Sequence, residues 1–387
     1  MRLDLHRHLE GSHSPAALAE VARRFDLRGP TFRDETGRFR TAAELAADVV
    51  MAGPSDDASL FYRCIVVARA AYVSVLAIGA LARRAFEEAA ADTDGFEMRL
   101  SLFSMARTLV EHGGLDWRQV PPLELAERYA RPILVEVIAA RDEVQAATAT
   151  RALLRLGLSR TFESEPHYRA LAAMVVEHAD ALVGLDVLGI VAPPDTEPMP
   201  AGLVAILDQL RRHLPDLTVH AGEFAGHASI DRTLELSPRG IGHGVHALES
   251  AATLERLARD GVTLEVCPTS NRLLIPTALA ALERAHGGKT PLCALQAAGV
   301  RCVLGSDDPT PIGTSFRAEH EVARAAGVDL ERLATDSVRR WTEIAGHPPA
   351  AGAAGGAGPG SARAGQSLIA MCPGCAATRA SHALTAG

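Results

Sequence analysis

The sequence predicts an α/β fold, a (β/α)8 barrel, and three observations favour it. Short apolar runs alternate with longer helical patterns along most of the chain, which is typical of parallel strands joined by right-handed crossovers. Eight such runs occur, the number of strands in this barrel. The later runs end in polar residues, where a barrel places its active site. Alternation alone would also fit an open doubly wound sheet.

The expected strands are short, and a helical pattern lies between most neighbouring pairs. They comprise residues 4–8, 96–103, 132–139, 181–189, 217–223, 240–245, 263–268 and 301–308. The long segment between the first two, about residues 27–93, predicts extra helices near the barrel mouth. Its most apolar part, residues 70–82, is well short of the ~20 residues that a membrane span needs, and it predicts a buried helix.

Two segments illustrate the helical signal. In "SPAALAEVARRF", Ser14 can cap a helix and Pro15 suits its first position. The residues expected on its apolar face are Leu18, Val21, Ala22 and Phe25. In "SAATLERLARD", which follows the sixth run, the expected apolar face holds Leu254, Leu257 and Ala258.

Composition indicates one barrel domain over residues 1–346, followed by a different kind of segment. The chain is 48% hydrophobic and 22% charged, which is typical of a globular protein with a sizeable core. Residues 347–387 begin with a Pro/Gly/Ala-rich stretch that has no periodicity, and we expect this tail to be disordered. No internal repeat is visible, and the sequence does not indicate an oligomeric state.

Charge and cysteine usage narrow the function class. The net charge is −8 and no run of Lys and Arg forms a basic stripe, which argues against nucleic-acid binding. The first residues lack the pattern of a secretory signal, and the six cysteines are scattered. We therefore expect a cytoplasmic protein with a small-molecule partner and no membrane association.

The chemistry-bearing residues fall at strand ends. In "LDLHRHLEGS", His6 and His8 are two apart, so they face the same side of a strand while Arg7 faces the other. Two converging imidazoles can hold a borderline metal such as zinc. An isolated pair of this kind would more often be two ordinary polar residues.

Further candidates end three later runs, and together they favour a metal site. These candidates are His220, Glu223, His243, Asp307 and Asp308. Three histidines and one carboxylate make a zinc ligand set, which leaves the remaining His, Glu and Asp for acid–base and orienting roles. Many two-metal barrel hydrolases use a carboxylated lysine on the fourth strand. The fourth run contains no lysine, so we expect a single metal.

The ordered motifs resemble the adenosine deaminase family, which includes adenine deaminases. The resemblance runs from Leu3 to about Glu343 and rests on "LDLHRHLEGS", "GLDVLG", "VHAGE", "GIGHGVHALE", "LEVCPTSN" and "GSDDP". It implies a barrel with one Zn²⁺ per chain. The implied metal ligands are His6, His8, His220 and Asp307.

The resemblance also implies catalytic roles. Glu223 would carry a proton to and from purine N1, His243 would orient and help deprotonate the zinc water, and Asp308 would hydrogen-bond N7. Zinc lowers the pKa of its water to about 7, and protonation of N1 makes C6 electrophilic. A carboxylic acid with a raised pKa in a dry pocket suits that protonation.

At the implied substrate contacts, this sequence departs in two places from the residues that are usual in the family. The backbone N–H of Gly189 would meet N3, and His8 and Glu10 would lie at the ribose side. Adenosine deaminases usually carry Asp where this chain has Glu10, and an acidic pair where Ile190 and Val191 follow Gly189. We expect adenosine and 2′-deoxyadenosine as substrates, with adenine as the alternative and a non-catalytic purine-binding protein as a remote one.

Overall fold

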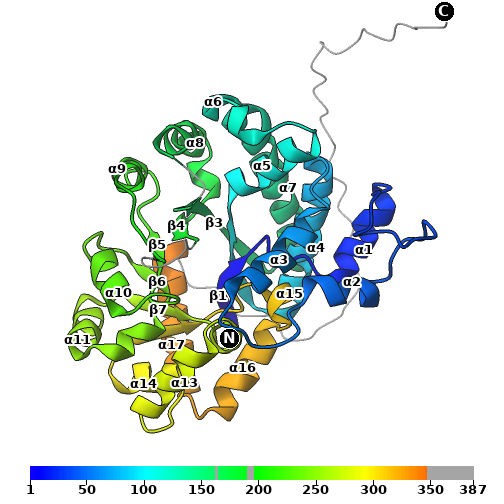
Figure 1. The fold of residues 1–387 in the computed structure, drawn as a ribbon. Coiled ribbons are helices and arrows are strands. Elements are labelled where there is room, and N and C mark those ends of the chain that lie inside the picture. The colour runs from blue at the N-terminus through cyan, green and yellow to red at the C-terminus, as the bar shows by residue number, and fades with distance from the viewer. Residues whose placement is uncertain (162–163, 190–195, 347–387) are drawn as a thin grey trace, which may run out of the picture. The chain divides into compact units, whose positions relative to one another are not determined.

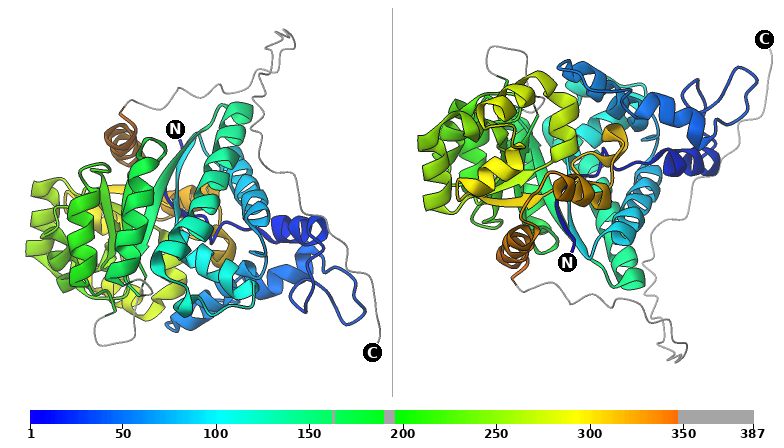
Figure 2. Two further views of the ribbon diagram at one scale, coloured as in Figure 1. Left: turned by 90° about the horizontal axis from the view of Figure 1, so that it is seen from above. Right: turned by 90° about the horizontal axis from the view of Figure 1, so that it is seen from below.

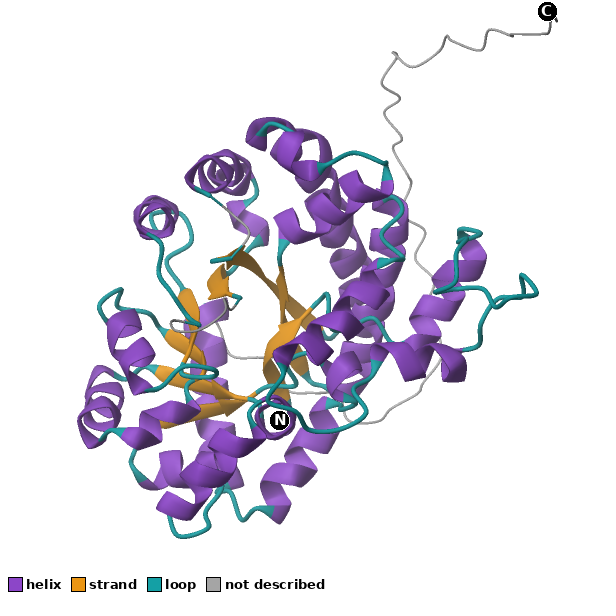
Figure 3. Cartoon of the chain, viewed as in Figure 1, coloured by secondary structure: helices purple, strands orange, loops and turns teal. Residues whose placement is uncertain are grey.

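The computed structural model describes residues 1–161, 164–189 and 196–346, and in them eight parallel strands form a barrel (Figures 1 and 3). The strands are neighbours in chain order, β1 to β8. Their bounds are β1 Leu3–His8, β2 Gly95–Leu100, β3 Arg151–Ser159, β4 Gly184–Leu188, β5 Leu217–Ala221, β6 Gly240–His243, β7 Thr263–Val266 and β8 Arg301–Leu304. A parallel bridge between Arg7 and Asp307 joins the last strand to the first, which excludes the open sheet.

Helices surround the strands, as the two views of Figure 2 show. Their bounds are α1 Pro15–Arg24, α2 Ala42–Val49, α3 Ala58–Arg69, α4 Val75–Asp92, α5 Leu102–His112, α6 Pro122–Glu124, α7 Arg131–Thr148, α8 Glu165–Glu177, α9 Ala201–Leu210, α10 His227–Leu234, α11 Ala251–Asp260, α12 Pro268–Leu274, α13 Pro276–Ala285, α14 Pro291–Ala297, α15 Pro309–Ile312, α16 Phe316–Ala325 and α17 Leu330–Ala345. Among the described residues, no helix has the length and apolarity to cross a membrane. Residues 347–387, the expected tail, lie outside the described residues.

One predicted strand is wrong and one real strand was missed. Residues 132–139 belong to helix α7, in which Ile133, Leu134, Val137, Ala140 and Val144 are buried at helical spacing. The apolar run was too short to separate a strand from a buried helix by length, and the helical period decides.

The missed strand is β3, which carries two arginines in an otherwise apolar run. Arg155 points into the barrel, where its guanidinium is fully buried and bound to both carboxylate oxygens of Glu97, at 2.7 and 2.8 Å. Arginine is rarely buried without a partner, so an arginine in the middle of an apolar run argues against a buried strand. This is why the sequence pattern of β3 was missed.

The remaining strand predictions are confirmed, with bounds that differ by a few residues at their ends. Helix α1 begins as predicted, with the Ser14 hydroxyl accepting a hydrogen bond from the Ala17 N–H at 3.1 Å. Helix α11 also forms, but Ala258 is exposed and Thr253 is buried in its place. The predicted helix over residues 70–82 begins only at Val75.

The extra helices between β1 and β2 are confirmed as α2, α3 and α4, with α1 before them. Helix α4 packs against α7 and contacts β2 and β3, so it belongs to the outer layer of the barrel. Helix α3 instead lines the cavity beyond the strand ends through one face, from Phe61 to Arg69. The predicted position of extra structure near the barrel mouth is therefore confirmed for α3.

Candidate metal centre and active site

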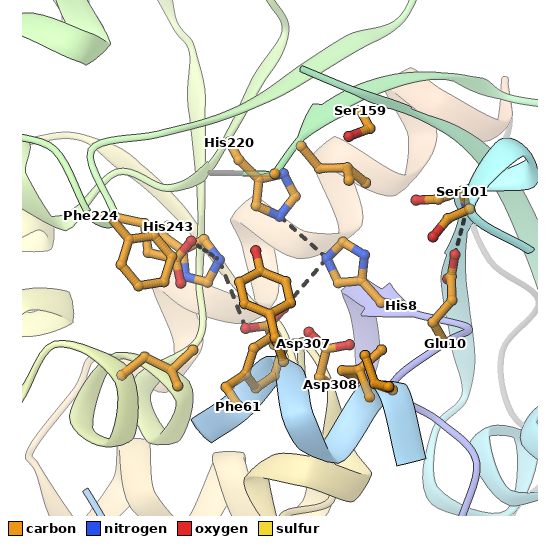
Figure 4. A pocket seen from close by; sticks show the side chains of 18 of the residues that line it. His8, Glu10, Phe61, Ser101, Ser159, His220, Phe224, His243, Asp307 and Asp308 are labelled. Atoms are coloured by element: carbon orange, nitrogen blue, oxygen red, sulfur yellow. Dashed lines mark hydrogen bonds and ion pairs between the residues drawn. The ribbon is translucent and has the colours of Figure 1, made fainter. Parts of the chain in front are cut away.

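Four potential metal ligands from three strands meet at the carboxyl end of the barrel. His6 and His8 come from β1, His220 from β5, and Asp307 lies three residues after β8. The Nε2 atom of His8 lies 3.2 Å from those of His6 and His220. The Asp307 Oδ1 atom lies 3.5 Å from His6 Nε2 and 3.4 Å from His8 Nε2. The four predicted ligands therefore converge, and Figure 4 shows three of them, His8, His220 and Asp307, side by side.

These separations fit a single zinc ion. With Zn–N and Zn–O bonds of about 2.0–2.2 Å, tetrahedral ligands stand about 3.3–3.6 Å apart. The four distances of 3.2–3.5 Å agree with that geometry. The three imidazoles and one carboxylate are also the donor types that zinc prefers.

His243 stands beside the same cluster. It groups with His6, His220 and Asp307, with one nitrogen or oxygen of each within 4.8 Å of the others. Its Nε2 atom lies 3.8 Å from Asp307 Oδ2, farther than His8 Nε2 lies from Oδ1. His243 is therefore close enough to act on a group held at the centre, while His8 is the better placed ligand.

Two buried carboxylates orient the histidines from below. The Nδ1 atom of His220 lies 3.1 Å from Asp186 Oδ1, and that of His6 lies 3.1 Å from Glu265 Oε2. Burial alone would raise the pKa of both acids, but neighbouring Arg99 and the histidines hold both pKa values below the usual range. Ionised carboxylates accept the Nδ1–H protons, which turns the Nε2 lone pairs toward the metal position.

Arg99 of β2 connects these carboxylates. Its guanidinium is fully buried, donates to Asp186 at 3.3 Å and to Glu97 at 3.0 Å, and also binds Glu265. A buried charge is stable only when it is paired and hydrogen-bonded. Sequence reasoning did not identify this residue. The available signal was "FEMRLS", a strand with two charges among apolar neighbours.

Two site residues adopt a backbone conformation that favours glycine. His243 has φ 61° and Asp307 has φ 60°. Such strain costs on the order of 1–3 kcal/mol for each residue and gathers at functional sites. At Asp307 it is held by two strand hydrogen bonds of 2.8 Å, Asp307 N–H to His6 and His8 N–H to Asp307. The barrel closure thus fixes the carboxylate against the two histidines.

Close packing explains one glycine of "GIGHGV". A Cβ atom at Gly242 would stand 2.9 Å from the His6 ring and 3.1 Å from the His220 ring. Because real Cβ contacts at such distances are rare, any larger residue would displace a ligand histidine. Gly242 does not have a positive φ, so its backbone conformation does not require glycine. Its role is to leave room for the two histidine rings.

Glu223 occupies the loop after β5 and faces His243, with 3.5 Å between Glu223 Oε2 and His243 Nε2. It is buried, and burial together with the charges of Asp307 and Glu197 raises the pKa of its carboxyl well above the usual range. A carboxyl that keeps its proton at neutral pH can donate it to a substrate atom. A raised pKa is the property expected of the acid, and the catalytic role of Glu223 stays a prediction.

Glu197 holds the loop that carries Glu223. Its carboxylate accepts hydrogen bonds from four successive backbone N–H groups, of residues 222–225, at 2.7–3.3 Å, and from the Ser229 hydroxyl. A ring of amides around one carboxylate fixes the backbone of the whole turn. Sequence reasoning missed Glu197 because it lies 25 residues from the loop and in no motif.

His243 has one ring nitrogen fixed by the protein. The side-chain amide of Asn271 lies 3.0 Å from His243 Nδ1, which leaves Nε2 toward the cavity. Burial and nearby Arg99, His6 and His220 lower the pKa of His243 to about 3, against the opposing charge of Asp307. The imidazole is therefore neutral in the folded chain. Asn271 belongs to the "CPTSN" motif, to which no role had been given.

The four expected substrate contacts, His8, Glu10, Gly189 and Asp308, all line the same cavity. Burial and the charges of Asp307 and Glu10 raise the pKa of Asp308 well above its usual range, so it can donate a hydrogen bond. Glu10 is buried and accepts from the Ser101 N–H at 2.8 Å. Gly189 has φ 90°, a conformation that a side chain would strain.

The cavity has a volume of about 240 Å³ and lies over the metal centre. Its walls are largely apolar, as in ordinary small-molecule sites. The apolar lining comes mainly from Phe61, Ile65, Leu188, Phe224 and Leu274. Figure 4 shows His8, His220, His243, Asp307 and Asp308 grouped on one side of it and Glu10 with Ser101 on another.

Comparison with known proteins agrees with this geometry. A family model described as adenosine deaminase matches residues 2–340. A putative adenosine/adenine deaminase from Streptomyces virginiae is 31% identical over 358 residues, covering 87% of this chain and 89% of that protein. An adenosine deaminase from Escherichia coli is 30% identical over 337 residues, covering 85% and 89%. A shorter match to an adenine deaminase from Sinorhizobium fredii is 45% identical over 108 residues, 28% of this chain and 31% of that one.

Solved structures support the fold. The adenine deaminase of Arthrobacter aurescens superimposes with a TM-score of 0.63 at 20% identity, covering 87% of this chain and 92% of that one. The N6-methyl-AMP deaminase of Arabidopsis thaliana gives 0.64 at 18% identity, covering 89% and 91%. Because the family model matches most of the chain and relatives of 30–31% identity match it over 85–87% of its length, this chain belongs to the adenosine deaminase family of hydrolytic deaminases.

Proposed function

We propose that the chain is a zinc-dependent aminohydrolase that converts adenosine and 2′-deoxyadenosine to inosine and 2′-deoxyinosine with release of ammonia, in purine salvage. The observation that carries this proposal is a buried carboxyl, Glu223, whose pKa is raised and which is set beside a His/Asp metal-donor cluster in one cavity. Metal activation of water and acid catalysis at a ring nitrogen are the two requirements of this hydrolysis.

The proposed metal ligands are His6, His8, His220 and Asp307. When bound there, Zn²⁺ supplies a water whose pKa is lowered to about 7, so that a hydroxide equivalent is available at neutral pH. Asp186 and Glu265 keep two of the histidines oriented toward the ion. The four described cysteines are free thiols, which suits the expected cytoplasmic setting.

The chain's own residues would perform the proton transfers. Glu223 donates its proton to purine N1, which draws electron density from C6. His243, neutral and with Nε2 toward the cavity, orients the attacking water and accepts its proton. Asp308 donates a hydrogen bond to N7, and the Gly189 N–H donates to N3. As the water oxygen bonds to C6 and the C6–N bond breaks, the water proton held by His243 passes to the amino group, which leaves as ammonia. The second water proton returns to Glu223, and the proton on N1 stays in the 6-oxopurine.

Adenine is the second candidate substrate. Glu10 stands where adenosine deaminases usually carry Asp, and its carboxylate is engaged by the Ser101 N–H. The shorter, more identical matches are to adenine deaminases. Both features favour a free base, whereas the long matches include adenosine deaminases.

The test is a panel of 6-aminopurines, from free base to nucleotide, assayed for ammonia release with zinc-loaded protein. Falling absorbance at the adenine band should accompany the ammonia. Higher kcat/KM for adenosine supports the first candidate, and higher kcat/KM for adenine supports the second. Absence of ammonia from every member, with zinc shown to be bound, would contradict the proposed activity and leave a purine-binding role.

A further inference from the structure

The cavity has a polar end away from the metal donors, built by α3 and α5. Arg69 is the last residue of α3, on the helical face that also lines the cavity through Tyr62 and Ile65. Ser104 and Arg107 are three residues apart on α5, so they share one face of that helix. All three polar residues line the cavity. Two guanidinium groups therefore border a site whose reaction, at the purine ring, requires neither.

Two polar atoms at this end have no partner in the described part of the chain. The Arg69 Nε and Ser104 Oγ atoms are buried and make no hydrogen bond with any described residue. No described carboxylate lies within ion-pair distance of Arg69. Buried donors without partners cost stability and are rare in folded proteins. Here they are explained if a ligand supplies the acceptors.

The polar end continues beyond the main cavity. Ser104, Arg107 and Ser159 also border a smaller cavity with Trp117 and His167. The Arg107 guanidinium lies 5.4 Å from the centre of the Trp117 ring, a cation–π contact at the border of this smaller cavity. The space thus extends past the region where a purine would meet the catalytic groups.

The direction of this extension follows from α5. The Ser101 N–H at the start of α5 binds Glu10, the residue expected at the ribose side. Arg107 lies six residues further, about 9 Å along the helix axis. A substituent on the ribose can cover such a distance, whereas a free base cannot.

We propose that the polar end is an anion subsite, in which Arg69, Ser104 and Arg107 bind a phosphate or carboxylate group carried on the ribose of the purine nucleoside. Guanidinium groups bind both anions through paired, charge-assisted hydrogen bonds, and a serine hydroxyl adds a further donor. The inference rests on the proposed function, because it assigns the substrate of that same site to the anionic purine nucleosides.

The test compares matched ligands on the zinc-loaded full chain. Adenosine 5′-phosphate and adenosine 5′-carboxylate are the anionic arms, and adenosine and its neutral 5′-carboxamide are the references. We expect kcat/KM to be roughly tenfold to hundredfold higher for at least one anionic arm, the range of a charge-assisted hydrogen bond. The better arm identifies the anion. Equal or lower kcat/KM for both arms would overturn the subsite.

Two variants of α3 distinguish the effect of a charge inside the subsite from the effect of a charge elsewhere on the same helix. In Arg69→Gln, the ratio of anionic to neutral kcat/KM should fall at least tenfold. Arg63→Gln removes the same charge from α3 at an exposed position outside the cavity, and its ratio should stay within about twofold of the native one. An unchanged ratio in Arg69→Gln would contradict the proposal.

A binding measurement keeps this inference independent of turnover. Calorimetric affinities of inosine 5′-monophosphate and inosine are compared in the native chain and in Arg69→Gln. Tighter binding of the phosphate in the native chain alone supports the subsite even if no purine is deaminated. Deamination of adenosine with equal affinity for the two products would retain the proposed function and refute the subsite.

Discussion

Replacing Glu197 with glutamine should loosen the loop that carries the proposed acid. In the native structure one carboxylate oxygen accepts from the N–H groups of residues 223–225 at 2.9–3.3 Å, and the other accepts from the Gly222 N–H at 2.7 Å and from the Ser229 hydroxyl. In Glu197→Gln the second oxygen becomes an NH₂ group. The Ser229 hydroxyl can rotate to accept from it, but the Gly222 N–H then faces another donor.

The magnitude follows from these contacts. An unsatisfied backbone N–H costs about 1–3 kcal/mol, and each of the other three N–H bonds loses about 1 kcal/mol when its acceptor becomes neutral. The neutral amide is easier to bury than the carboxylate, which offsets part of this loss. We therefore expect the free energy of unfolding to fall by about 2–5 kcal/mol, a large share of the 5–15 kcal/mol typical of a domain.

The assay combines urea unfolding with turnover of the best 6-aminopurine. Because Glu223 lies within this loop, displacement of its carboxyl by about 1 Å should lower kcat roughly 100-fold while zinc stays bound. Asp92→Asn is the control. Asp92 accepts from the Phe316 N–H at 2.5 Å at the start of α16 and does not line the active-site cavity, so stability should fall by about 1 kcal/mol with kcat within about twofold. Native stability and native kcat in Glu197→Gln would refute the reasoning.

Three further predictions concern the proton, the metal and pH. Glu223→Gln should bind zinc normally but lose most of its turnover, and native kcat would contradict the acid role. Asp186→Asn removes the carboxylate that orients His220, so zinc affinity measured against a chelating indicator should fall about 10- to 100-fold; an unchanged affinity would argue against orientation from below. Burial, with the charge of Arg69, lowers the pKa of His13 to about 3. Since the unfolded chain gains a proton below about pH 6.5 that the folded chain does not, native stability should fall between pH 7 and 5.5 by about 1.3 kcal/mol more than that of His13→Gln. Equal changes in the two proteins would show that His13 is not buried in its neutral form.

The strand ends were predictable because local spacing carries their information. His6 and His8 share a face through the two-residue period of a strand, and the carboxyl ends of parallel strands meet at one end of a barrel. Polar residues at or just after the ends of β5, β6 and β8 therefore had to approach them. The fold class and the candidate ligands follow from this reasoning. The third strand could not be predicted in this way. The sequence pattern favours residues 132–139 in place of residues 151–159, because arginines mask the apolar pattern of the real strand.

The sequence by itself determined which chemical groups reach the site, and the tertiary structure decided what holds them there. Glu265 is 259 residues from His6, and Glu197 is 25 to 28 residues from the amides that it binds. Arg99 joins Asp186 of β4, Glu265 of β7 and Glu97 of its own strand, and no local pattern encodes such partners. Pairing across the barrel interior depends on which side chains face each other after closure. Burial then makes these pairings strong, because unpaired charges cannot remain in a dry interior.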